Sequence, residues 1–375
     1  MTFDKFRHVV ENRHDYAREW KSATGGKVCG CLCGNVPEEI IYASGMLPVR
    51  ILGEEKTPTL AAAHMQDNRC AFCRGCLEEG LRGRYDYIDG LVYVHSCIAT
   101  SQTYSSWVLH VPLAWSYRMD RPSRRDTPLG KENYRDCLEG FRLSLGEWLG
   151  SPISEEALAQ SVATYRTNRQ LMRQVYELRK MHPPLISGSD AKRMVLASML
   201  MDKEKHNDLL QQLLQEKHEP RELDSSRVRV MIIGAGMDDV GFTELVESVG
   251  GDVVIDDHCL GLRYFWGNPV IDEDPMAAIT SYYFDEKPDC PSQDWFGDRR
   301  MERLLWLAKE YDVETVIWLA QAFCGTHQWD IVDGAALFEK EGIPFLQLER
   351  DVTIPEGIFR NRIEATLEIA KGQLV

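Results

Sequence analysis

The sequence has no uninterrupted apolar run of about 18 residues, so we expect no membrane span. Its opening, MTFDKFRHVVENRHDY, lacks the apolar segment of a signal peptide, and we expect a cytoplasmic protein. Positive charge is scarce, because 43 Lys and Arg face 58 Asp and Glu and leave a net charge of -15. This balance argues against nucleic acid as the main partner. A P-loop pattern is also missing, so we do not expect this chain to hydrolyse ATP itself.

Cysteine, by contrast, is plentiful, with 11 residues in a chain of 375. In a cytoplasmic protein, cysteines are more often metal ligands or buried thiols than disulfides. Seven of the cysteines lie between Cys29 and Cys97, which an even distribution would not produce. The chain is therefore a candidate metalloprotein.

Short apolar runs alternate with helical patterns at both ends of the chain, which is typical of an α/β fold with parallel sheets. Between them the pattern changes to three long helical segments, with Ser154 and Ser189 as expected N-caps. We predict two Rossmann-like lobes joined by a long helical segment. The predicted divisions are residues 1–130 for the N-terminal α/β lobe, 131–224 for the helical region and 225–375 for the C-terminal α/β lobe.

Three cysteines stand where a predicted strand ends or a predicted helix begins. Cys97 ends the apolar run IDGLVYVHSC, and Cys324 ends the run ETVIWLAQAFC. In open α/β folds, ligands bind in the crevice beyond the carboxyl ends of such strands. Cys70 opens the predicted helix 69–83, where the helix dipole favours a thiolate. We expect these three thiols to face one shared cleft between the lobes.

The other cysteines of the N-terminal lobe leave several interpretations open. Cys70, Cys73 and Cys76 have the spacing of the first part of a ferredoxin cluster motif, but the fourth cysteine is missing. One helix holding all three to one cluster is awkward, so Cys70 alone is the favoured ligand. Cys29, Cys31 and Cys33 alternate along a predicted strand and face one way. They are packing thiols or part of a second metal site or larger cluster.

Two further segments have both a structural and a functional interpretation. GAGMDDVG at 234–241 lacks the third glycine of a dinucleotide fingerprint, which favours a tight structural turn. The run Arg263–Trp266 either packs between the lobes or contacts an aromatic, phosphate-bearing ligand. His95 and His327 lie beside Cys97 and Cys324, so each is either an ordinary histidine or a group that moves protons near a cluster.

Several of these segments together resemble the benzoyl-CoA reductase and 2-hydroxyacyl-CoA dehydratase family, which includes the 2-hydroxyglutaryl-CoA dehydratase D-component. The resemblance covers nearly the whole chain. It rests on the segments NVPEEIIYASGMLPVRI, Cys70 before its helix, VYVHSC, AFCGTHQWD and FLQLERDVTIPEGIFRNRIEATLE.

The resemblance implies that Cys70, Cys97 and Cys324 hold one 4Fe-4S cluster in the cleft between the lobes. It also implies an acyl-CoA substrate, a homologous second subunit or a second copy of the chain, and a separate ATP-dependent iron-sulfur activator protein. An anionic radical formed on such a substrate needs nearby hydrogen-bond donors. The candidates for this catalytic role are His95, Asn35, Gln321 and His327.

Within the family, the HisSerCys turn at 95–97 and the run 263–266 favour a benzoyl-CoA reductase, which transfers low-potential electrons to an aromatic acyl-CoA ring. The alternative is a subunit of a radical (R)-2-hydroxyacyl-CoA dehydratase. A further alternative is a homodimeric reductase of small molecules with a double-cubane 8Fe-9S cluster. Its additional ligands would come from Cys73, Cys76 or the Cys29–Cys33 set. Outside the enzymes, the alternative is an iron-sulfur protein that carries electrons without catalysing a reaction.

Overall fold

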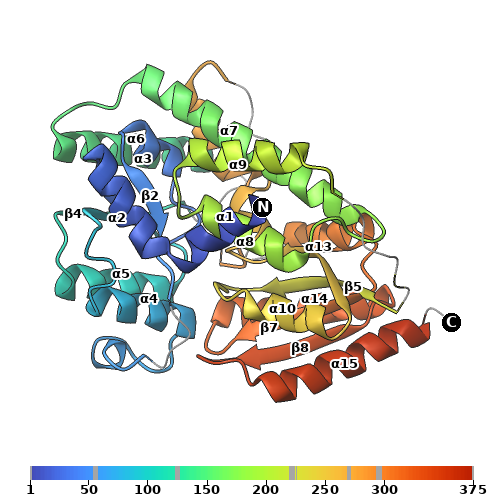
Figure 1. The fold of residues 1–375 in the computed structure, drawn as a ribbon. Coiled ribbons are helices and arrows are strands. Elements are labelled where there is room, and N and C mark those ends of the chain that lie inside the picture. Colours follow the sequence, from blue (N-terminus) through green and yellow to red (C-terminus); the bar gives the residue numbers. More distant parts are fainter. Residues whose placement is uncertain are drawn as a thin grey trace.

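The computed structural model describes residues 2–53, 58–122, 127–218, 224, 226–267, 272–292 and 298–373 (Figure 1). It contains two four-stranded sheets, and every strand pair in both sheets is parallel. The predicted α/β fold with two Rossmann-like lobes is therefore confirmed. Within the described residues, no helix is both long and apolar enough to cross a membrane.

The first sheet has the strand order β2-β1-β3-β4. Strands β1 to β3 are buried along their whole length, as expected of a sheet covered on both faces. The edge strand β4 is half-exposed and polar, and its sequence WSYRM gave no strand prediction. The elements are β1 (Val28–Cys31), α3 (Glu38–Ala43), β2 (Leu47–Arg50), η1 (Ala61–Ala63), α4 (Ala71–Leu81), β3 (Gly90–Val94), α5 (Ile98–His110) and β4 (Trp115–Met119).

The second sheet has the order β6-β5-β7-β8, so its first strand again lies between the second and the third. In both lobes the strand order therefore reverses direction between the first and third strands, and this point is where open α/β sheets bind ligands. The elements are β5 (Val228–Gly234), α10 (Gly241–Ser248), β6 (Gly251–Asp257), α11 (Leu262–Phe265), α13 (Asp298–Glu310), β7 (Thr315–Gln321), α14 (Gly325–Lys340), β8 (Phe345–Arg350) and α15 (Glu356–Gln373).

Within its described residues, the helical region contains four long helices rather than three. The pattern predicted as one helix from Ser189 onward is two helices, the second capped by Asp202. Ser154 caps α7 as predicted, but Ser187, not Ser189, caps α8, because its side chain accepts from the Asp190 amide. Two further helices, α1 and α2, precede the first sheet. These elements are α1 (Thr2–Glu11), α2 (Arg13–Thr24), α6 (Pro128–Leu149), α7 (Glu155–Glu177), η2 (Leu178–Lys180), α8 (Gly188–Ser198) and α9 (Lys203–Gln215).

Helix α7 runs along one side of both lobes (Figure 1). Its Arg169 forms a buried ion pair with Glu39 of the first lobe. Its Tyr176 donates a 2.7 Å hydrogen bond to Asp256 of the second lobe. The chain also returns to the first lobe through α12 (Pro275–Ser281) and the π-helix Tyr282–Glu286, which join the core around β1. The predicted boundary at 224–225 adjoins residues 219–223 and 225, which lie outside the described residues.

Asp257, at the end of β6, anchors one wall of the space between the lobes. Its fully buried carboxylate lies 3.3 Å from Arg263, 2.6 Å from Arg300 and 3.0 Å from Arg303. Burial alone would raise the pKa of Asp257, but these guanidinium groups hold the pKa below its usual range. The carboxylate is thus the shared counter-charge for three cations.

We expect Asp257→Ala to lower the free energy of unfolding by about 3–5 kcal/mol, because it removes a buried carboxylate that neutralises Arg263 and Arg303 and leaves Arg300 with Asp330 as its ion-pair partner. Urea denaturation measures this. The control is Asp15→Ala, whose carboxylate pairs with Arg18 on the surface at 3.5 Å and should cost less than about 1 kcal/mol. Equal effects of the two substitutions would contradict the assigned role.

Candidate functional site

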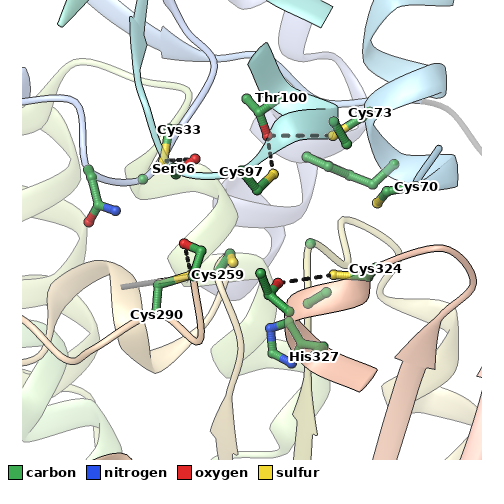
Figure 2. Close-up of a pocket in the computed structure, with 18 of the residues that line it drawn as sticks. Cys33, Cys70, Cys73, Ser96, Cys97, Thr100, Cys259, Cys290, Cys324 and His327 are labelled. Carbon is green, nitrogen blue, oxygen red and sulfur yellow. Dashed lines mark hydrogen bonds between the residues drawn. The ribbon is translucent and has the colours of Figure 1, made fainter. Parts of the chain in front are cut away.

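The carboxyl ends of the two sheets border one pocket of about 460 Å³ (Figure 2). The loops after β1 and β3 supply its wall in the first lobe, and the loops after β5, β6 and β7 supply its wall in the second. Seven cysteines line the pocket, namely Cys33, Cys70, Cys73, Cys97, Cys259, Cys290 and Cys324.

The three predicted cysteines all line this pocket, and each occupies the same structural position. Cys70 is the N-cap of α4, Cys97 of α5 and Cys324 of α14. Three helix dipoles therefore direct their positive ends at the three thiols, which favours the thiolate form. Before Cys324 the backbone of Phe323 adopts a φ of 62°, an uncommon conformation for an aromatic residue, and this turn sets where α14 begins.

The thiols on this side of the pocket interact with one another. Hydrogen bonding with Cys73 lowers the pKa of Cys70, and bonding with Cys73 and then Thr100 lowers the pKa of Cys97 to about 6. The Thr100 hydroxyl lies 3.1 Å from the Cys97 sulfur and 3.6 Å from the Cys73 sulfur. Burial, with the negative charge of Cys70, raises the pKa of Cys324 to about 12. Three thiolates here would repel one another, and positively charged iron would offset that repulsion.

A second group of thiols lies on the other side of the pocket. Figure 2 shows Cys33 facing Cys259 and Cys290, whereas Cys70 and Cys324 lie together farther along. Hydrogen bonding with Cys259, followed by the charge of Arg263, lowers the pKa of Cys290 well below its ordinary value. The Ser292 hydroxyl donates to the Cys290 sulfur at 3.3 Å, and the Cys33 thiol donates to Ser96 at 3.5 Å.

Cys259 and Cys290 were not among the predicted site residues. Cys259 follows β6 just as Cys97 follows β3, so the apolar run GDVVIDDHC carries the same signal of a cysteine at the end of a strand. Cys290 lies on a loop that no strand pattern marks. Cys33 was considered only with Cys29 and Cys31, which are buried in the core, as is Cys76.

The charged side chains that line the pocket are cationic. They are Arg50, Arg263 and Lys287, and no Asp or Glu is among the described lining residues. In a chain with a net charge of -15, such a local excess of positive charge suits an anionic occupant. A cluster held by several thiolates is anionic, so the cations and the thiols fit the same group.

The predicted polar residues are only partly brought together here. Asn35, His95 and His327 line the pocket, but Gln321 does not. The Gln321 amide instead donates to the Asp351 carbonyl at 2.8 Å and accepts from Arg350 at 3.2 Å, so it holds the end of β8. His327 is buried, and its Nδ1 has no partner within the described part of the chain.

The pocket offers the kind of donor that iron-sulfur clusters bind, because its potential metal ligands are mainly cysteine thiols. Hydroxyl groups lie beside several of these sulfurs. Among the described residues, no group of three His, Cys, Asp or Glu side chains lies close enough to hold a single metal ion.

Comparison with known proteins agrees with this geometry. Residues 33–370 match the model of the family described as 2-hydroxyglutaryl-CoA dehydratase, D-component. The chain belongs to this family. The resemblance inferred from the sequence motifs is thereby confirmed.

Three similar proteins are named as enzyme subunits. The chain is 24% identical to the beta subunit of (R)-phenyllactyl-CoA dehydratase from Clostridium sporogenes, over 93% of each chain. It is 27% identical to a benzoyl-CoA reductase subunit from Thauera aromatica, over 82% of this chain and 81% of that one. It is 24% identical to the beta subunit of (R)-2-hydroxyglutaryl-CoA dehydratase from Acidaminococcus fermentans, over 97% and 98%. Both branches considered from the sequence are thus represented.

The thiol interactions predict the reactivity of the metal-free protein. Only the thiolate reacts with iodoacetamide, so alkylation of Cys97 should reach half its maximal rate near the Cys97 pKa of about 6. Cys73→Ala removes the main hydrogen bond that lowers this pKa, and the midpoint should move up toward the ordinary thiol value of about 8.5. Peptide mapping by mass spectrometry measures the rate against pH.

The matched control is Cys76→Ala, because Cys76 lies on the same helix but does not line the pocket. This substitution should leave the midpoint unchanged. A midpoint that stays in place in Cys73→Ala would show that Cys73 does not lower the pKa of Cys97.

Proposed function

We propose that this chain is an iron-sulfur oxidoreductase whose pocket holds a double-cubane 8Fe-9S cluster and reduces a small molecule. The observation that supports it is the division of the pocket thiols into two groups. Cys70, Cys97 and Cys324 would hold one cubane, and Cys33, Cys259 and Cys290 would hold the other. Three cysteines per cubane leave one iron of each without a thiolate, where the two halves can be joined. This proposal takes the place of the benzoyl-CoA reductase hypothesis as the favoured one.

The cluster, when bound, supplies electrons at low potential to the molecule in the pocket. The chain sets the conditions for that chemistry. Hydroxyl groups beside the sulfurs, on Ser96, Thr100, Ser292 and Thr326, would bond to thiolates and so tune the potential. Arg50, Arg263 and Lys287 offset the negative charge, and the apolar remainder of the wall limits water.

The proposed partners follow from what the chain does not provide. It has no P-loop, so an ATP-dependent iron-sulfur activator would deliver the low-potential electrons. The relatives are named as subunits, which supports assembly with a homologous chain or with a second copy.

A second candidate is a subunit that acts on acyl-CoA, either a benzoyl-CoA reductase or a 2-hydroxyacyl-CoA dehydratase, with one 4Fe-4S cluster on Cys70, Cys97 and Cys324. Its support is that the named relatives match over most of their length and belong to these two enzyme types. Asn35, His95 and His327 would then face the acyl group.

Counts of iron and acid-labile sulfide on anaerobically purified protein distinguish the double-cubane candidate from the single-cluster candidate. The double cubane predicts about eight irons per chain, with more than half lost in Cys290→Ala, in Cys259→Ala and in Cys324→Ala. Cys31→Ala and Cys76→Ala remove buried thiols outside the pocket and should keep the full count.

About four irons, lost in Cys324→Ala but retained in Cys290→Ala and Cys259→Ala, would instead support a single cluster. Aromatic and 2-hydroxyacyl thioesters would then be tested with the activator and partner chain. Iron retained in Cys324→Ala would contradict both candidates.

A further inference from the structure

Lys287 is a buried lysine in the wall of the pocket, on the side of Cys33 and Cys290. It directly follows the π-helix, whose last bond runs from the Lys287 amide to the Tyr282 carbonyl at 2.8 Å. Single π-turns inside helical segments are frequent at functional sites. The turn places the ammonium group 5.3–5.6 Å from the ring centres of three tyrosines, Tyr264, Tyr282 and Tyr283.

The ammonium group of Lys287 is weakly neutralised. Its Nζ donates to the Tyr264 carbonyl at 2.9 Å, and no described carboxylate lies within ion-pair distance. The other two cations of the pocket differ from it. Arg263 is paired with Asp257, and both Arg263 and Arg50 carry guanidinium groups, which do not release protons in proteins. Lys287 is therefore the pocket cation that can change its charge.

The histidines of the pocket are less suited to this task. His327 is buried, and burial together with the charge of Arg263 and Arg300 keeps its pKa well below the ordinary value, so it stays neutral. His95 has a side chain 49% exposed and lies 3.7 Å from Asp120, at the rim rather than in the interior. Of these three side chains, Lys287 is the one that is both enclosed in the wall and able to change its charge near neutral pH.

We propose that Lys287 takes up a proton from water when the pocket accepts an electron, and that it then supplies this proton to the reduction. The proposal rests on the proposed function, since it requires a bound cluster. A low-potential one-electron donor reduces the cluster. The neutral Lys287 amine takes a proton from a water molecule, whose O–H bond breaks, and the hydroxide leaves to the solvent, so the net charge of the pocket stays the same. When the electron passes to the substrate, the N–H bond breaks and the proton forms a bond with the reduced atom.

The surroundings of Lys287 support this exchange. Burial, followed by the charge of Arg169, lowers the pKa of Lys287 to about 7, so both forms are accessible near neutral pH. Added negative charge on the cluster raises the lysine pKa, which couples proton uptake to reduction. The titratable and charged groups around Lys287 are Cys33, Glu38, Glu39, Arg169, Tyr264, Tyr282 and Tyr283.

The test is a potentiometric titration followed by electron paramagnetic resonance, with titanium(III) citrate as reductant, on protein of known iron content. Above about pH 7 the midpoint potential of the wild type should fall by about 59 mV per pH unit, the value for one proton per electron. In Lys287→Met and in Lys287→Arg the midpoint should not depend on pH, since neither side chain titrates in this range. Lys131→Met, on the exposed surface near the π-helix, should keep the slope.

If Lys287 acted only through a fixed charge or through packing, Lys287→Met would shift the midpoint potential of the cluster, but that potential would still depend on pH as in the wild type. A slope retained in both Lys287 variants at wild-type iron content would thus overturn the inference while leaving the cluster assignment intact. The iron count is measured separately and tests the proposed function on its own.

Discussion

The buried contact between Tyr264 and Glu38 joins the two walls of the pocket. The Tyr264 hydroxyl donates a 2.6 Å hydrogen bond to the Glu38 carboxylate and accepts one from Lys203 at 2.7 Å. Tyr264 follows Arg263 of the second wall, and Glu38 opens the helix after Asn35 of the first. Because an unpaired charge at this depth is costly, the contact fixes the spacing of the two walls, and the arrangement of the thiols depends on that spacing.

The two lobes contribute to the pocket in a nearly symmetric way. Cys97 follows the third strand of the first sheet, and Cys324 follows the third strand of the second, so the two thiols occupy equivalent positions. Their sheets have the same strand order, and the point where that order reverses faces the pocket in both lobes. The symmetry does not extend to Cys33 and Cys259. Strand β5 is followed by Ala235 and Gly236, and β2 is followed by Ile51 and Leu52, so neither has a cysteine at the matching position.

Much of this arrangement follows from sequence patterns, and the remainder depends on contacts between distant segments. The buried strands are recognisable in the sequence as apolar runs. Cys97 and Cys324 follow two such runs and Cys70 begins a predicted helix, and from these positions the three thiols were predicted to meet in one cleft. Polar edge strand β4 gave no such pattern, and Cys290 reaches the pocket on a loop whose path depends on packing of the π-helix. Gln321 also ends a strand, but its amide bonds to Arg350 and Asp351 and not to the pocket. The sequence around Gln321 does not show which of these directions its side chain takes.

The division of the thiols between the lobes would link binding of the proposed cluster to the fold. Cys70 and Cys97 come from the first lobe and Cys324 from the second, whereas Cys33 comes from the first and Cys259 and Cys290 from the second. Each group of three therefore spans the space between the lobes, and a cluster held by either group is a cross-link between them. Ligands that bind only the native state stabilise it. The same bonds that would hold the iron would thus hold the two walls, and Lys287 with them, at the distance that the chemistry needs.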